Sequence, residues 1–273
     1  MNIADKLLTI AENIPKVYEA GQKAGGDYES AYNDGYDDGY TEGETTGYNN
    51  GVADGRTAEW SDLWDDFQNN GTRRNYQNAF ALYSWSDKTF KPKYDLIVTN
   101  GSQMFIQNQK ITNLKKLLDD AGVTLDFSNN TNALQCFQLS AMTHLPTIDL
   151  SMVTNASYVF ASMSNLVEIE KLILSSKTPQ NNMFYQTPSL TTLTIEGVID
   201  KNGFNVQWST KLSRTSFLSI LKALNITVIG VTVTLPTNCI DGATNTLTTI
   251  QNDTELNSAY TTAIANGYTI AFA

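Results

Sequence analysis

A unit of about 23 residues recurs in the second half of the chain, and this period limits the choice of fold more than any other feature. Phe137, Phe160 and Phe184 stand 23 and 24 residues apart. Each is followed by a leucine and, three residues later, by a second aliphatic residue, in the pairs Leu145 and Ile148, Leu166 and Ile169, and Leu190 and Leu193. Each unit closes on a short run of β-forming residues: TIDLS (147–151), KLILS (171–175) and TLTIE (192–196).

A period of about 20 to 29 residues with one short strand in each unit is typical of a leucine-rich solenoid. In such a fold the strands stack in parallel, their alternate apolar side chains are buried, and the phenylalanine fills the opposite side of the coil. Weaker copies of the strand flank the clear ones, at VTLDFS (123–128), TVTLP (232–236) and YTIAF (268–272). We therefore expect an α+β fold with stacked parallel strands in residues 95–273.

Helical segments interrupt these units. Asn113 is a candidate N-cap for the segment LKKLLDDA, and Gly122 follows it as a terminator. The segment SRTSFLSILKAL (213–224) has a similar pattern and begins after Ser213 or Thr215. We expect both helices to replace the turn of a repeat. The closing sequence DTELNSAYTTAIANGYTIAFA predicts a short helix, a break at Gly267 and a final strand, which together form a C-terminal cap.

Nearer the N-terminus, glycines recur every four residues and aromatic residues follow the same phase. The glycines are Gly35, Gly39, Gly43, Gly47, Gly51 and Gly55, and the aromatic residues are Tyr32, Tyr36, Tyr40, Tyr48, Trp60 and Trp64. A glycine inside a helix costs about 1 kcal/mol relative to alanine, so a helix here needs close packing against another protein surface. We predict a long, self-associating helical arm. An acidic flexible linker and a cation-binding segment are the alternatives.

The C-terminal end of this arm is marked by aromatic residues and a glycine. Trp60, Trp64 and Phe67 share one helix face, which is expected to be core or interface. An Asn-Asn-Gly sequence ending at Gly71 then stops the helix. The predicted domains are the oligomerisation and attachment arm (1–71), an aromatic N-terminal cap (72–94) and the repeat domain with its C-terminal cap (95–273).

The net charge of −10 resides almost wholly in the arm. Residues 1–70 carry 15 acidic and 4 basic side chains, whereas residues 71–273 carry 13 and 14. Because no basic stripe is present, we expect no nucleic-acid partner. The first residues lack the continuous apolar core of a signal peptide, and no segment reaches the roughly 18 apolar residues of a membrane span. Cys136 and Cys239 form no CxxC pair and are expected to be small buried residues.

Residues able to support catalysis are sparse. His144 is the only histidine, which excludes Ser-His-Asp triads, Cys-His dyads and multi-histidine metal sites. Glu168 and Glu170 could in principle act as a glycosidase pair, but they flank Ile169 in a strand, and a solvated strand face explains them better. No glycine-rich loop has a phosphate-binding or dinucleotide-binding pattern. We expect no enzymatic activity, no cofactor and no metal.

Outward residues of the stacked strands are the expected site if the repeats bind a ligand. Seven polar residues there are suited to hydrogen bonds with hydroxyl or basic groups: Thr147, Asp149, Glu168, Glu170, Thr192, Thr194 and Glu196. The alternative is that these side chains only solvate the strand face.

Two resemblances to known families add to this interpretation. The pattern from Ala156 through Phe160, Leu166, Ile169 and Ile173 resembles the leucine-rich repeat of BspA-like bacterial surface antigens. The order of segments along nearly the full chain is similar to that of bacteriophage virion-associated proteins of the tail-fibre or head-fibre type. That order is ADKLLTIAENIPKVYEAG, the Gly/Tyr arm, WSDLWDDFQNNGTRRNYQNAF, TFKPKYD, the repeats and NGYTI.

The second resemblance implies a non-enzymatic structural protein of the virion, made in the host cytoplasm and placed on the tail or capsid surface. Its arm would form a homo-oligomer, with a trimer as the first choice by analogy with phage fibres, and would dock onto other virion proteins. Its repeat domain would contact a host-surface glycan or protein, without membrane insertion. A bacterial cell-surface adhesin is the alternative, and a glycan-processing virion enzyme is a third hypothesis.

Overall fold

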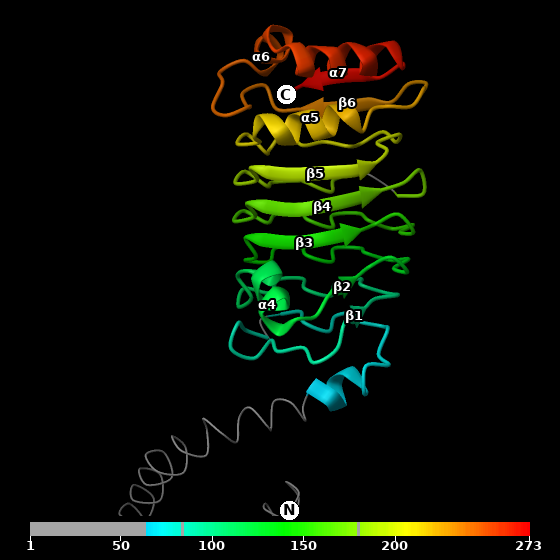
Figure 1. The fold of residues 1–273 in the computed structure, drawn as a ribbon, viewed down its shortest axis with the longest axis vertical. Helices are drawn as coiled ribbons and strands as arrows, with labels where there is room; N and C mark the ends of the chain where they lie inside the picture. The colour runs from blue at the N-terminus through cyan, green and yellow to red at the C-terminus, as the bar shows by residue number, and fades with distance from the viewer. Residues whose placement is uncertain (1–63, 83–84, 179–180) are drawn as a thin grey trace, which may run out of the picture. The chain divides into compact units, whose positions relative to one another are not determined.

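The computed structural model describes residues 64–82, 85–178 and 181–273. They fall within one compact unit, Ser61–Ala273. This unit mixes α-helices with short parallel strands (Figure 1), in agreement with the α+β class expected from the sequence. The predicted helical arm, its six glycines and its aromatic residues up to Trp60 lie outside the described residues, so the arm and its role stay predictions.

Three stacked strands form the central sheet (Figure 1). β3 (His144–Asp149), β4 (Glu168–Leu174) and β5 (Thr192–Gly197) pair in parallel and in chain order. The repeated aliphatic residues meet in this register, since Leu145 pairs with Ile169 and Ile169 with Leu193, and all three are buried. The three clear runs of β-forming residues are therefore confirmed as strands.

Two smaller parallel sheets flank the central one. β1 (Leu96–Ile97) pairs with β2 (Leu125–Asp126), and β6 (Thr232–Leu235) pairs with β7 (Thr269–Phe272). The weaker copies of the strand are thus confirmed as strands, but they do not extend the central sheet. β6 instead stacks on the segment that follows β5, where Thr234 N donates to Phe204 O and Val206 N donates to Thr234 O, both at 3.0 Å.

Helices occupy strand positions at both edges of the central sheet. α4 (Leu114–Ala121) begins after Asn113, which forms a parallel backbone bridge with His144 at the start of β3. α5 (Arg214–Lys222) lies along the other edge, beside β5 (Figure 1). We expected each helix to replace a turn, and this expectation was wrong. Because a helix rises about 1.5 Å per residue and a strand about 3.3 Å, a unit that contains a helix needs more residues to cross the same distance.

The predicted helix caps form as local sequence requires. Asn113 Oδ1 accepts from Lys116 N at 2.9 Å, and Gly122 ends α4 in the left-handed conformation with φ 65°. Ser213 caps α5, where its Oγ accepts from Ser216 N at 3.3 Å. Side-chain oxygens that satisfy free N–H groups therefore fix the start of both helices.

The C-terminal segment contains one helix that the sequence did not predict. α7 (Thr254–Ala265) was expected, and it begins after its N-cap Asp253. α6 (Thr246–Asn252) precedes it. Its sequence TLTTIQN has weak helix propensity because its residues include β-branched threonine and isoleucine. Asn245, whose Oδ1 accepts from Thr248 N at 2.9 Å, and the buried Ile250 stabilise it nonetheless.

Between successive strands, the chain forms tight turns around buried phenylalanines, and these turns stack on one another as the strands do. We call these segments the phenylalanine turns, and they are residues 75–82, 100–107, 132–139, 155–162 and 181–187. The first four share the pattern Asn-x-x-x-x-Phe, in which the asparagine Oδ1 accepts from the backbone N–H two residues later, as Asn100 does from Ser102 N at 3.1 Å.

The phenylalanine rings form a continuous stack through the core. The centroid separations are 4.9 Å for Phe80–Phe105, 5.4 Å for Phe105–Phe137, 5.7 Å for Phe137–Phe160 and 5.4 Å for Phe160–Phe184. All five side chains have no solvent exposure. The buried position expected for the repeated phenylalanine is confirmed, and Phe80 and Phe105 extend the series to two turns that the 23-residue period did not reveal.

The backbone of these turns is left-handed at two places in each. The residues two before and two after each phenylalanine have φ between 53° and 59°: Asn78, Leu82, Gln103, Gln107, Gln135, Leu139, Tyr158, Ser162, Asn182 and Gln186. This conformation costs a non-glycine residue roughly 1–2 kcal/mol. Backbone hydrogen bonds between neighbouring turns offset it, as where Phe80 N donates to Met104 O at 2.8 Å and Phe105 N donates to Cys136 O at 2.7 Å.

Aromatic residues close the stack at the end that precedes β1. Residues 64–68 are helical, and the ring of the fully buried Trp64 lies 4.9 Å from that of Trp85 and 5.5 Å from that of Phe90. The predicted helix stop is confirmed, since Gly71 and the two asparagines before it have positive φ. Residues 64–71, which we assigned to the arm, pack with the body. The three-part domain division stays a prediction, because most of its first part is not described.

Candidate binding surface

The seven residues predicted as a binding face come together on the three strands of the central sheet. Their side chains are half-buried or exposed, and they occupy neighbouring register positions. Glu168 on β4 pairs with His144 on β3 and with Thr192 on β5. Asp149 ends β3, and its Oδ1 accepts from Ser151 N at 2.8 Å, so this carboxylate also fixes a turn. The half-buried Ile173 lies in register between Asp149 and Glu196, so the strip is polar but not continuous, and its role in binding stays a prediction.

Two lysines and a histidine that the sequence analysis left out of the strip lie close to three of its carboxylates. Lys171 Nζ lies 2.9 Å from Glu196 Oε2, and Lys115 Nζ lies 3.7 Å from Glu170 Oε1. His144 Nε2 lies 3.9 Å from Glu168 Oε2. The hydrogen bond to Glu196 raises the pKa of Lys171, so this lysine stays charged throughout the neutral range. The strip therefore carries charges of both signs, which salt screens because the side chains are exposed.

Lys171 was missed because strict alternation along β4 would place it inward. Leu145 and Ile148 on β3, like Ile169 and Leu172 on β4, are buried residues three apart, whereas Leu193 and Ile195 on β5 are two apart. The β4–β5 register shifts between Ile169 and Leu172 for this reason. Two consecutive residues of β4, Glu170 and Lys171, then reach solvent. The three-residue spacing was visible in the sequence and could have identified the lysine.

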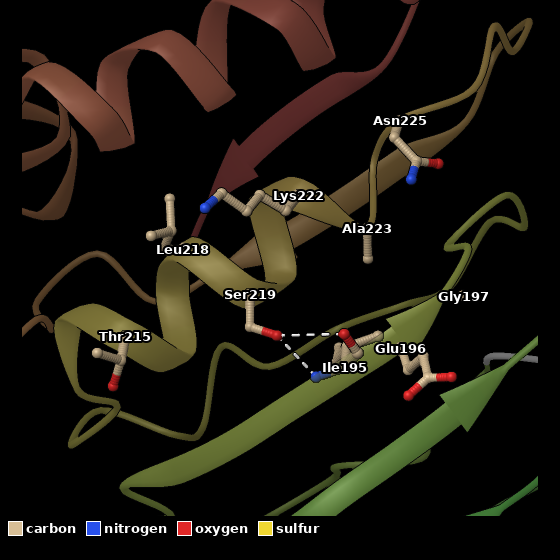
Figure 2. Close-up of a pocket in the computed structure, with 9 residues that line it drawn as sticks. All are labelled: Ile195, Glu196, Gly197, Thr215, Leu218, Ser219, Lys222, Ala223 and Asn225. Atoms are coloured by element: carbon tan, nitrogen blue, oxygen red, sulfur yellow. Dashed lines mark hydrogen bonds between the residues drawn. The ribbon is translucent and has the colours of Figure 1, made fainter.

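A shallow hollow of about 430 Å³ adjoins the strip where the sheet meets α5 (Figure 2). Ile195, Leu218 and Ala223 give it an apolar lining, and Glu196 of the strip and Lys222 lie on opposite sides of it. Lys222 Nζ contacts Glu255 Oε1 at 3.0 Å, which turns this cation toward α7. The hollow extends the strip with a small apolar surface between charged groups.

Serines on α5 complete the edge of the central sheet. Ser216 Oγ accepts from Leu193 N at 2.9 Å, and Ser219 Oγ accepts from Ile195 N at 2.7 Å. Both hydroxyls also donate to strand carbonyls, Ser216 to Thr191 O at 3.0 Å and Ser219 to Ile195 O at 3.3 Å, the second drawn in Figure 2. α5 thereby protects an edge that would otherwise be free to pair with another strand.

The histidine and the two cysteines, which lie outside the predicted strip, contact or are buried among residues of the fold. His144 Nδ1 lies 2.8 Å from Thr143 Oγ1 at the half-exposed start of β3. Cys136 and Cys239 are buried as expected, and burial raises the pKa of both thiols. Within residues 64–82, 85–178 and 181–273, no three His, Cys, Asp or Glu side chains group in a way that could hold a metal ion. The helices of the same ranges include none with the length and apolarity needed to cross a membrane.

Of the predicted oligomerisation residues, the structure describes only Trp64. Its side chain is buried within the chain, and its Nε1 donates to Thr89 O at 3.1 Å. Trp64 therefore stabilises the body and offers no surface to another chain. The remaining members of that set lie outside the described residues.

The surface as a whole is suited to reversible binding through hydrogen bonds and paired charges presented on a rigid sheet. Searches of protein-family models, curated proteins and solved structures gave no significant match to this chain.

Proposed function

We propose that the protein is a non-enzymatic structural component of a bacteriophage virion, of the tail-fibre or head-fibre type, which displays a leucine-rich-repeat solenoid. The observation that carries this proposal is the register between successive units. β3, β4 and β5 bond to one another in register, and each of the first four phenylalanine turns bonds to the next, so outward side chains of successive units form rows. Stacked repeats of this kind create extended surfaces that suit recognition.

The solenoid assignment rests on three features that repeat together. The strands β3, β4 and β5 stack in parallel, the phenylalanine rings stack behind them, and the turns between them share their left-handed positions. Aromatic residues close one end, and α6, α7 and β7 close the other. Closed ends are what solenoids require to remain soluble.

The N-terminal arm, in this proposal, forms a homotrimer and docks onto other virion proteins. The glycines spaced four apart and the concentration of acidic residues in residues 1–70 support this role. The displayed body then contacts a host-surface glycan or protein. A bacterial cell-surface adhesin is the second candidate, and the pattern from Ala156 to Ile173, which resembles surface-antigen repeats, favours it.

Electron microscopy with an antibody against the body tests the location. We expect label on the tail or capsid surface of purified phage particles. Label on the envelope of bacteria free of particles would overturn the virion assignment and support the adhesin.

Sedimentation equilibrium of the full chain tests the arm. We expect a trimer that Gly43→Leu combined with Gly47→Leu converts to monomer, while the melting curve of the body is unchanged. Thr45→Leu combined with Thr46→Leu places the same leucine side chains off the glycine row and should leave the trimer intact. If the natural chain sediments as a monomer, the proposal of an oligomeric arm is wrong.

A further inference from the structure

A second hollow, distinct from the strip, lies where two phenylalanine-side loops meet β6. It measures about 480 Å³ and is lined by four asparagines, two threonines and one glycine: Asn181, Asn182, Asn202, Asn205, Thr232, Thr234 and Gly203. We call it the asparagine–threonine hollow. Every lining residue is uncharged, and all but the glycine end in an amide or a hydroxyl. Such groups can both donate and accept hydrogen bonds.

Two of the four amides of the hollow are held in place by hydrogen bonds from the backbone. Asn202 Oδ1 accepts from Thr232 N at 2.7 Å, and Asn205 Oδ1 accepts from Gln207 N at 2.9 Å. These bonds use the carbonyl oxygen of each amide and leave its Nδ2 as the group able to donate to a ligand. Because β6 is itself paired with the segment around Phe204, the threonines and asparagines keep a fixed separation.

Gly203 is required for the shape of this hollow. Its φ is 97°, and a Cβ at this position would lie 2.2 Å from Asn181 Oδ1. Only glycine therefore allows the Asn181 amide to lie directly against the neighbouring loop. The hollow is a built feature that depends on one special backbone position.

One partly exposed aromatic side chain contacts a residue of the hollow, and two more belong to the chain segments that line it. Asn182 Nδ2 donates to Tyr158 OH at 3.4 Å, and the tyrosine remains 38 % exposed. Three residues after Asn182 and Asn205 stand Tyr185 and Trp208, whose ring centroids are 5.7 Å apart and whose side chains are each 41 % exposed. Large apolar rings that stay exposed beside polar groups are typical of binding sites.

We propose that the asparagine–threonine hollow binds a neutral oligosaccharide. Sugar hydroxyls match fixed amides and hydroxyls, and the C–H faces of a sugar ring match exposed tyrosine and tryptophan rings. The five phenylalanine turns contain no charged residue, and the nearby Asp200 and Lys201 contact each other at 3.8 Å, so nothing in the hollow selects a phosphate or an acidic sugar. We rest this inference on the proposed function, for which it supplies a ligand class and a site.

Calorimetric titration of the purified full chain tests the ligand class. The probes are maltohexaose, cellohexaose, chitohexaose and galactohexaose, with hexagalacturonate and an uncharged Gly-Ser peptide as comparisons. We expect at least one neutral hexasaccharide to bind and the acidic sugar and the peptide not to bind. Binding of hexagalacturonate or the peptide alone, or of no probe, would overturn the inference. These outcomes are independent of the virion test, which reports only on location.

A matched pair of variants tests the site. Thr232→Val combined with Thr234→Val removes two hydroxyls but keeps shape and strand propensity, and we expect affinity to fall by about ten-fold or more. Thr269→Val, at the β7 position in register with Thr232, lies outside the hollow and should leave affinity unchanged. Equal affinity in the double variant and the natural chain would contradict the proposal.

Hydrogen exchange on the natural chain gives an answer that does not depend on the variants folding. Saturating neutral hexasaccharide should slow exchange in residues 202–206 and 232–234. Protection confined to β3, β4 and β5 would place the site on the strip instead.

Discussion

The parallel strands and the phenylalanine turns stack through different chemistry. On the strand side, extended backbone buries aliphatic residues and presents charged residues outward, among them Glu168, Lys171 and Glu196. On the side of the phenylalanine turns, left-handed backbone buries aromatic rings and presents only uncharged residues. The strand side is therefore sensitive to salt, and the turn side can recognise neutral groups without competition from ions.

This difference implies that stability depends most on the turn side. The phenylalanine rings continue through five successive turns, whereas the central sheet covers three strands. A ring in the middle of the stack has neighbours on both sides, so its loss leaves a cavity that adjacent units cannot fill by small shifts.

The largest expected effect is that of Phe160→Ala. The ring is fully buried between Phe137 and Phe184, and its removal should lower the free energy of unfolding by about 3–5 kcal/mol. Urea unfolding followed by circular dichroism measures the change. Tyr185→Ala, in the next turn but 41 % exposed, is the control and should cost much less. Similar losses in both variants would mean that the stack is not the main core.

Ser219→Ala tests whether the serine hydroxyl of α5 stabilises the edge of β5. The substitution leaves Ile195 N without its 2.7 Å partner at the edge of β5, and we expect a loss of about 1–3 kcal/mol in the free energy of unfolding. Ser258→Ala removes the same hydroxyl from an exposed position of α7 and should stay within about 0.5 kcal/mol. If the two variants unfold at the same urea concentration, water satisfies Ile195 N in place of the serine, and the serine hydroxyl does not stabilise the edge of β5.

Features set by local chemistry were the ones the sequence predicted. Asn113 marked the start of α4, and Ser213 was one of two candidates for the start of α5, because a helix cap depends on a few consecutive residues. α7 was predicted from the segment that begins at Asp253 and ends before Gly267. The strands followed from the repeated aliphatic pairs. α6 was missed because tertiary burial of Ile250 and a cap at Asn245 outweigh a poor local propensity.

Features set by the neighbouring unit were the ones missed. The turns at Phe80 and Phe105 were missed because we looked for a constant spacing of about 23 residues. The interval from Phe105 to Phe137 contains α4 and is 32 residues long. The pattern that begins at Asn75 and Asn100 and ends five residues later in phenylalanine would have revealed both. Lys171 was left out of the polar strip because strict alternation along β4 was assumed, although the three-residue spacing of the buried Ile169 and Leu172 was visible in the sequence. The asparagine–threonine hollow was not predicted either, because its lining comes from three segments that are separated in the sequence.

A valine exchange compares the outward positions of the two sides directly. Gln107→Val places a β-branched residue at φ 55°, and we expect it to cost about 1–2 kcal/mol in urea unfolding. Thr194→Val places the same residue at an exposed position of β5, where extended backbone suits it, and should be neutral within about 0.5 kcal/mol. Equal effects would show that the left-handed positions can relax.

The smallest effect we expect is that of acid on the contact between α5, which borders β5, and α7. Arg214 on α5 forms two bonds to Asp253 at the start of α7, at 2.7 and 2.8 Å, and this contact lowers the pKa of Asp253 from 3.8 to about 2. A carboxyl whose pKa is lower in the folded state contributes stability above its unfolded pKa and loses it as pH falls through the folded value. Stability should therefore decline as pH falls from about 4 to about 2.

Asp253→Asn separates this contribution from the rest of the acid response. Asparagine still caps α7 but carries no charge, so the decline between pH 4 and pH 2 in urea unfolding should become shallower without disappearing. A decline remains because Lys93 lowers the pKa of Asp65 and Lys222 lowers that of Glu255. An unchanged pH profile in the variant would mean that the α5–α7 contact does not distinguish the folded from the unfolded chain.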